Sequence, residues 1–133
     1  MNTDIEIRQI LKMKTIAVVG MSPKPERYSH KIGKYLKEQG YTVIPVNPGH
    51  DEIIGLRTYP TLKDIPFPVD VVNVFRKAEF CEPIAKISVE IGAKALWLQE
   101  GIVNNNAMQI STKGGLFYVQ NRCILKEHIL YSE

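Results

Sequence analysis

One short stretch of the chain contains small, hydroxyl-bearing and basic residues at spacings that could bind an anionic ligand. These residues are Gly20, Ser22, Lys24, Arg27 and Ser29. They follow an apolar, β-branched run, 15–19, which is typical of a strand buried on both faces. The periodic apolar residues after them predict a helix with Ser29 as its hydroxyl N-cap. Because a helix N-terminus presents free N–H groups and a favourable dipole to an anion, the stretch predicts a phosphate site.

This stretch departs from the two common phosphate-binding fingerprints. Ser22 and Pro23 stand where the dinucleotide-binding pattern G-x-G-x-x-G has further glycines. The Gly-Lys-Ser/Thr of a P-loop is also missing. A strand, a glycine and a helix often form a plain connection, so neighbouring segments must decide whether a ligand binds there.

Composition excludes several classes of protein. The chain has 133 residues, of which 44% are hydrophobic and 23% charged, as expected of one ordinary soluble domain. A net charge of +3 is small for a nucleic-acid-binding protein, and no apolar run approaches a membrane span. The N-terminal residues carry acids and no apolar signal core, so we expect a cytoplasmic protein. We expect Cys81 and Cys123 to be reduced.

Strands and helices are predicted to alternate along the chain. A peripheral N-terminal helix is expected within 1–13, with Thr3 and Glu6 at capping-box spacing. Predicted strands cover 15–19, 41–46, 70–75, 94–98 and 116–119. Predicted helices cover 29–40, 83–92, 104–113 and 124–130, the last with Leu125, His128 and Ile129 on one side. The segment 50–67 is mixed, with a short extension near 53–57 and one helical turn at 62–65.

This alternation predicts an α/β fold with a single Rossmann-like, doubly wound parallel sheet of about five strands in the order 3-2-1-4-5. The whole chain, 1–133, is expected to form one domain. In such sheets a ligand binds outside the carboxyl ends of the strands, at the switch point beside the first strand. Residues that directly follow the strands should meet there: Gly20-Met21-Ser22, Asn47-Pro48-Gly49, Phe75-Arg76 and Gln99-Glu100-Gly101.

The end of the second predicted strand bears on the kind of nucleotide. Rossmann domains that bind NAD usually carry an acidic residue there, which holds the ribose hydroxyls. Here the strand ends in Val46-Asn47-Pro48, and Asp51 and Glu52 lie beyond the turn. This pattern disfavours NAD, and the expected lack of a second domain disfavours a dehydrogenase. No Ser/His/Asp set can be placed either.

Six stretches in a fixed order resemble a known family: VVGMSPKPERYSHKIGKYL (18–36), GYTVIPVNPG (40–49), EIIGLRTYPTLKDIP (52–66), VDVVNVFR (69–76), IGAKALWLQEGIVN (91–104) and NRCILKEH (121–128). The chain resembles the small single-domain coenzyme A-binding proteins, which are related to the CoA-binding domain of the succinyl-CoA synthetase α subunit. The motifs VNP, VFR and WLQEG are specific in combination. The resemblance covers nearly the whole chain beyond the first dozen residues.

The resemblance implies a Rossmann domain that binds coenzyme A. By position, the phosphates would be held by Gly20, Met21, Ser22, Pro23, Lys24, Arg27 and Ser29. Asn47-Pro48 would flank the adenosine, and Phe75-Arg76 with Gln99-Glu100-Gly101 would line the pantetheine path or its mouth. Tyr28 stands where the resemblance would have proline, which should change the rigidity of the loop more than its charge. No histidine matches the phosphorylated histidine of the synthetase, so synthetase activity is not implied.

The leading interpretation is a CoA- or acyl-CoA-binding module without catalytic residues or a metal site. We expect it to bind neither nucleic acid nor membrane, and a homo-oligomer and an unknown protein partner both stay open. Two alternatives stay open: an NAD(P)-binding or acyl-transfer enzyme component that needs a partner chain, and a regulatory interaction module. The fragments 50–52 and 123–128 each lack the ligands of a closed zinc site.

Several of these residues also have a plainer alternative role. Arg76 could pair with Glu79 or Glu100 instead of a ligand, and Glu100 could hold backbone or Arg76. His30 could touch phosphate, although an exposed helical histidine is the simpler interpretation. Cys123 could lie near the CoA thiol or be a buried structural thiol.

Overall fold

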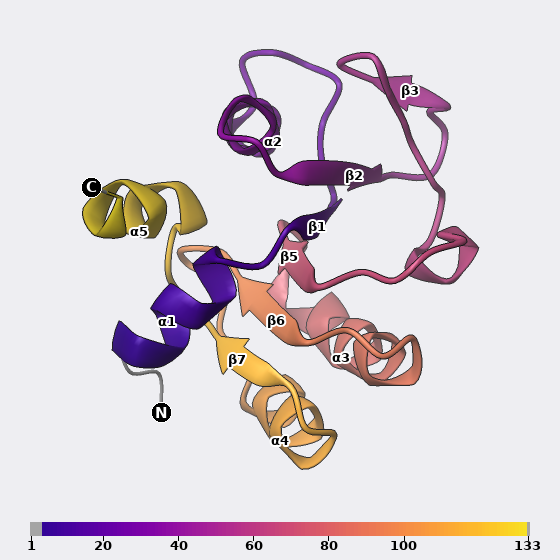
Figure 1. Cartoon of the computed structure of the whole chain (residues 1–133). Helices are drawn as coiled ribbons and strands as arrows, with labels where there is room; N and C mark the ends of the chain where they lie inside the picture. Colours follow the sequence, from indigo (N-terminus) through magenta and orange to yellow (C-terminus); the bar gives the residue numbers. More distant parts are fainter. Residues whose placement is uncertain (1–3, 133) are drawn as a thin grey trace.

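The computed structural model describes residues 4–132, and its centre is a five-stranded parallel sheet (Figure 1). The strands are β1 (Thr15–Val19), β2 (Thr42–Val46), β5 (Val71–Val74), β6 (Ala95–Leu98) and β7 (Phe117–Val119). All four neighbouring pairs are parallel. The α/β fold class with five parallel strands is therefore confirmed, whereas the predicted cap at Thr3 lies outside the described residues.

The strand order corrects one prediction. The order is β2-β1-β5-β6-β7, so the third long strand of the chain, β5, pairs with β1 and does not lie outside β2. All four residues of β5 are buried, which requires a central position covered on both faces. Beyond β2, Tyr59 forms a single parallel bridge with Val46. The predicted order was wrong because an apolar run specifies burial and not the neighbouring strand.

Helices cover both faces of the sheet (Figure 1). The helices α1 (Asp4–Leu11), α2 (Tyr28–Glu38) and α5 (Ile124–Tyr131) pack on the face that carries Ile16 and Val18. On the other face, Ala17 and Val19 pack with α3 (Cys81–Glu90) and α4 (Asn105–Lys113). Within the described part of the chain, no helix has the length and apolar character to cross a membrane.

The segment between β2 and β5 contains only short elements. A hairpin of β3 (Glu52–Ile53) and β4 (Leu56–Arg57) is followed by a single 3-10 turn, Leu62–Asp64. A short extension near 53–57 and one helical turn at 62–65 were predicted, so the turn is confirmed and the extension is a hairpin. A second 3-10 turn, Ala78–Phe80, leads into α3. The segment between β2 and β5 lies beside β2 at the carboxyl edge of the sheet, where it can form one wall of a site.

One helix prediction was wrong in detail. The helix α2 begins at Tyr28 with Arg27 as its N-cap residue, so Ser29 lies inside the first turn and does not cap it. In α5 the deeply buried residue is Ile124, while Leu125 and His128 are partly buried and Ile129 is 58% exposed. The helix therefore touches the core mainly through its first turn.

Candidate functional site

The carboxyl edge of the sheet contains the topological switch point. From β1 the chain passes through α2 to β2 and then crosses back to β5 on the other side of β1. The loops after β1, β2 and β5 therefore meet at one edge, which is where ligands bind in open parallel sheets. The predicted convergence beside the first strand is present for these three loops.

A cavity of about 430 Å³ opens at this edge, a size within the range of small-molecule sites. Its apolar lining comes from the strand ends, the segment 60–62 and α3: Val19, Val46, Pro48, Pro60, Leu62, Ile84 and Ile87. Its polar side chains are Asn47, Thr61 and Arg76, and Gly20 also lines it. Apolar walls with a few polar groups suit a ligand that has both a flat ring and charged groups.

Four residues of the predicted site line this cavity: Gly20, Asn47, Pro48 and Arg76. Two of its walls, the segment 60–62 and the α3 face with Ile84 and Ile87, were not predicted as site residues. The stretch 52–66 was one of those that carried the family resemblance, and this was the available signal for the first wall. The second wall had no signal, because its apolar residues look like ordinary core positions.

Gly20 allows two loops to come close together. Its φ is +86°, in the left-handed region that side chains rarely adopt. A Cβ at this position would lie 3.1 Å from Cδ of Arg76 and 3.1 Å from the carbonyl oxygen of Phe75. Its N–H donates a 2.9 Å hydrogen bond to the carbonyl oxygen of Val46. Glycine is therefore required both by the backbone angle and by the approach of the loop after β5.

Asn47 connects the other loops of the site. Its side-chain Nδ2 donates to the carbonyl oxygen of Met21 over 2.8 Å, and its backbone N–H donates to Tyr59 over 2.9 Å. The Met21 side chain is fully buried and packs toward Gly33, so it faces away from the carboxyl edge. Only the backbone of Met21 belongs to the site.

The loop between β1 and α2 is held by its own serines. The N–H of Ser22 donates to Oγ of Ser29 over 2.9 Å, and the N–H of Lys24 donates to Oγ of Ser22 over 3.1 Å. The hydroxyl of Ser29 thus fixes the loop and not the helix start. Pro23, Lys24 and Arg27 are exposed and lie outside the cavity lining, so their contact with a ligand stays a prediction.

His30 is buried, which corrects the expectation of an exposed helical histidine. The side chain is 7% exposed, and Nδ1 lies 2.9 Å from the carbonyl oxygen of Ser22. Because a carbonyl oxygen only accepts, Nδ1 carries the hydrogen and donates it. Ser29 and His30, both in the first turn of α2, therefore hold the N–H and the carbonyl oxygen of Ser22.

Arg76 is held by an aromatic ring and not by a carboxylate. Its guanidinium carbon lies 4.4 Å from the ring centroid of Phe80. Among residues 4–132 it forms no ion pair, so the alternative pairing with Glu79 or Glu100 is not found. Phe75 is partly buried against the core on the α2 side. Arg76 therefore presents an unpaired charge at the cavity.

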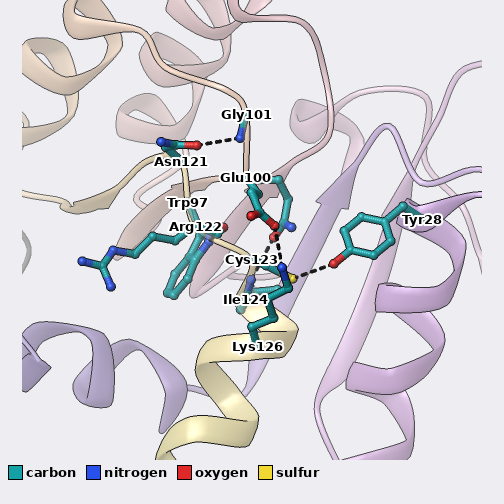
Figure 2. Close-up of polar contacts among 10 residues, drawn as sticks. Tyr28, Trp97, Glu100, Gly101, Asn121, Arg122, Cys123, Ile124 and Lys126 are labelled. Carbon is teal, nitrogen blue, oxygen red and sulfur yellow. Dashed lines mark hydrogen bonds and ion pairs between the residues drawn. The ribbon is translucent and has the colours of Figure 1, made fainter.

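The group Gln99-Glu100-Gly101 does not line the cavity. Its contacts hold α5 in place, and those of Glu100 and Gly101 are drawn in Figure 2. Gln99 is 2% exposed, and its Oε1 accepts a 3.1 Å hydrogen bond from the N–H of Ile124. Glu100 pairs with Lys126 over 3.1 Å. The N–H of Gly101 donates to Oδ1 of Asn121 over 2.7 Å. The polar groups of these residues thus join the end of β6 to the start of α5.

Tyr28 and Cys123 form a contact between α2 and α5 at the same edge (Figure 2). The phenol oxygen lies 3.1 Å from Sγ of Cys123. This hydrogen bond, with burial and nearby negative charge, raises the pKa of Tyr28 to about 12. Cys81 and Cys123 are both buried free thiols. Among the described residues, no three His, Cys, Asp or Glu side chains gather as a metal site.

Comparisons with known proteins agree with this architecture. The family model described as a CoA binding domain matches residues 14–129. YneT of Bacillus subtilis is 41% identical over 124 residues, which cover 92% of each chain. The α subunit of the ADP-forming acetate–CoA ligase II of Pyrococcus furiosus is 34% identical over 82 residues. That match covers 61% of this chain and 17% of the ligase subunit, so the chain corresponds to a small part of that protein.

Solved structures show the same fold over the whole chain. A hypothetical protein from Pyrococcus horikoshii superposes with a TM-score of 0.93 at 42% identity, over 97% of this chain and 92% of that one. A protein from Thermus thermophilus superposes with a TM-score of 0.90 at 35% identity, over 98% of both chains. Together with the family match, these similarities confirm the resemblance seen in the sequence motifs: the chain belongs to the CoA-binding domain family.

Proposed function

We propose that this chain binds coenzyme A, or an acyl-CoA, at the carboxyl ends of β1, β2 and β5, and that it catalyses no reaction alone. The observation that carries the proposal is the 430 Å³ cavity at the switch point. Gly20, Asn47, Pro48 and Arg76 line it, and each belongs to a motif that also carries the family resemblance. Its position agrees with the general rule for ligands of open parallel sheets.

The chemistry of the cavity suits the nucleotide end of CoA. The apolar walls from β2, 60–62 and α3 can hold an adenine ring, and Asn47 and Thr61 offer hydrogen bonds to it or to the ribose. Arg76 has a free guanidinium fork for a phosphate. Lys24 and Arg27, exposed on the adjacent loop, add positive charge for the remaining phosphates. The pantetheine arm would extend from this cavity along the strand ends.

A purely binding role is supported by the side chains at the site. The polar side chains of the cavity are an amide, a hydroxyl and a guanidinium, and among its described residues none is a carboxylate, histidine or thiol. The two thiols of the chain are buried, and Glu100 pairs with Lys126. A general base beside a nucleophile, which acyl transfer needs, is therefore not assembled in this cavity.

Calorimetric titration of the pure protein with CoA, dephospho-CoA and NAD tests the proposal. We expect CoA to bind more tightly than NAD, and removal of the 3′-phosphate to weaken binding. Tighter binding of NAD, or failure of CoA to bind, would contradict it. Incubation with acetyl-CoA, followed by assay of free thiol, should show no release of CoA. Turnover of the acyl-CoA by the pure chain would overturn the non-catalytic part.

A further inference from the structure

Asn47 occupies the position at which a Rossmann-like sheet usually contacts the ribose of its ligand. It follows β2 directly and lines the cavity at the switch point. In sheets that bind NAD, an Asp or Glu at this place accepts a hydrogen bond from the ribose. An uncharged amide in place of that carboxylate changes the charge that the ribose meets.

The side-chain amide of Asn47 has a fixed orientation. Nδ2 lies 2.8 Å from the carbonyl oxygen of Met21, and because a carbonyl oxygen only accepts, the nitrogen must be the atom on this side. Oδ1 forms no hydrogen bond within the described part of the chain, and the protein does not enclose it. Asn47 therefore offers a ligand in the cavity a neutral acceptor, whereas its donor is already used.

No acidic side chain takes the place of the missing carboxylate. Among the described residues that line the cavity, none is Asp or Glu, and the charged side chain is Arg76. The acids nearest in sequence, Asp51, Glu52 and Asp64, line a different hollow, which the residues of the β3–β4 hairpin form with 58–60. The charge at the cavity is therefore positive.

The ribose of CoA differs from the riboses of NAD in a way that suits this arrangement. Its 3′-oxygen carries a phosphate, so the 2′-hydroxyl is the ribose hydroxyl that remains to donate. A phosphate monoester has a charge of about −1.5 to −2 at pH 7. A carboxylate that accepted from the 2′-hydroxyl would lie beside this phosphate and repel it, since like charges at short distance raise the energy of the complex. A neutral amide oxygen accepts the same hydrogen bond without this repulsion.

We propose that Asn47 makes the site selective for an adenosine whose ribose carries a 3′-phosphate. Oδ1 of Asn47 accepts from the 2′-hydroxyl, and the absence of a negative charge at this position admits the phosphate on the neighbouring oxygen. Arg76, which forms no ion pair among residues 4–132, adds the positive charge that favours it. This inference rests on the proposed function, because it assigns a specificity to one residue of the same cavity.

Calorimetric titration of the wild type and of Asn47→Asp with CoA and with dephospho-CoA tests this role. The substitution keeps an acceptor oxygen and adds a negative charge, while the lost bond to Met21 weakens both ligands by the same factor. We expect the wild type to prefer CoA, and Asn47→Asp to reduce the ratio of the two dissociation constants at least about threefold. Asn106→Asp, at an exposed position of α4, is the matched control and should keep the ratio of the wild type.

A second measurement uses the wild type alone and does not depend on the folding of a variant. CoA in which the ribose 2′-hydroxyl is replaced by hydrogen lacks the donor for Oδ1 of Asn47. We expect this analogue to bind at least about fivefold more weakly than CoA, which is the scale of one lost hydrogen bond. Equal affinities for CoA and the 2′-deoxy analogue would overturn the role of Oδ1.

The outcomes separate the role of Asn47 from CoA binding itself. If CoA binds and the ratio is the same in the wild type and in Asn47→Asp, then Asn47 holds the loops together without selecting the ligand, and the proposed function still stands. A wild type that binds CoA and dephospho-CoA equally would also overturn the selectivity. Failure of CoA to bind the wild type would contradict the proposed function, and the selectivity with it.

Discussion

Asn47 and Met21 are joined by a hydrogen bond of 2.8 Å from the side-chain amide to the carbonyl oxygen, across the two loops that follow β2 and β1. The backbone N–H of Asn47 also donates to Tyr59, next to the wall at Pro60. One residue thus positions the loop after β1, the end of β2 and the segment 59–62. The shape of the cavity depends on these bonds.

We predict that Asn47→Asp weakens both the fold and CoA binding. A carboxylate is similar in shape to the amide but cannot donate to Met21, so about 1 kcal/mol of stability should be lost. The binding free energy for CoA should fall by about the same amount, which corresponds to at least about a fivefold loss of affinity. Urea denaturation and calorimetry measure the two effects. Asn106→Asp, at an exposed position of α4, makes the same charge change and should leave the affinity for CoA unaltered.

Gly20→Ala should disturb both the backbone and the site. The left-handed backbone angle and the 3.1 Å approach of Arg76 and Phe75 both oppose a Cβ, so we expect a loss of about 1 kcal/mol or more. Gly92→Ala is the matched control, because Gly92 also has a positive φ, of +77°, but has open space around it. Thermal unfolding should show destabilisation in both variants, while only Gly20→Ala weakens CoA binding. Equal affinities of Gly20→Ala and Gly92→Ala for CoA would show that CoA binding does not need the close approach of the loops after β1 and β5.

Arg27→Ala is predicted to weaken CoA binding by more than about 1 kcal/mol, the scale of a lost charged hydrogen bond. Arg27 is exposed and makes no side-chain capping bond, so the substitution should leave the stability of the fold nearly unaltered. Arg27→Lys separates charge from geometry, because lysine keeps the charge and loses the planar fork. An Arg27→Ala protein that binds CoA like the wild type would remove Arg27 from the site.

His128 should make the stability of the protein depend on pH. Burial against α2 lowers the pKa of His128 below its usual value of 6.5, and its Nδ1 lies 2.7 Å from the hydroxyl of Tyr35. As the pH falls below about 6.5, the unfolded chain takes up a proton that the folded chain still excludes. The free energy of unfolding should therefore decrease toward acid, by at most about 1.4 kcal/mol per pH unit from this group.

Urea denaturation at several pH values between 7 and 5 measures this effect. His128→Gln should remove most of this pH dependence, whereas His50→Gln, at an exposed position, should retain it. If the free energy of unfolding changes with pH equally in the wild type, His128→Gln and His50→Gln, then other groups cause the pH dependence.

The main elements of the fold could be predicted because their signals are local. The run Thr15–Val19 and the turn after Val46 define strands through apolar β-branched residues and a Pro-Gly break. The order of the strands could not be predicted in the same way. The run 71–74 shows that it is buried but not that it pairs with β1, and the single bridge at Tyr59 has no sequence pattern.

The candidate site could be predicted in part for a similar reason. Gly20 and Asn47 follow β1 and β2 directly, and Arg76 comes just after Phe75 at the end of β5, so the topology alone brings them to one edge. Gln99 and Gly101 also follow a strand, but Oε1 of Gln99 accepts from Ile124 and the N–H of Gly101 donates to Asn121, so these two groups are used within the fold. A sequence does not show which partner a polar group will find, and so it could not separate these two sets.

A crystal structure of this chain with CoA bound tests the proposed binding site directly. We expect density for the adenosine of CoA in the cavity beside Pro48 and Ile84, with a phosphate within hydrogen-bond distance of Arg76. The loop 20–27 should lie against the remaining phosphates. Density for CoA at another place on the molecule, with this cavity empty, would contradict CoA binding at the carboxyl ends of β1, β2 and β5.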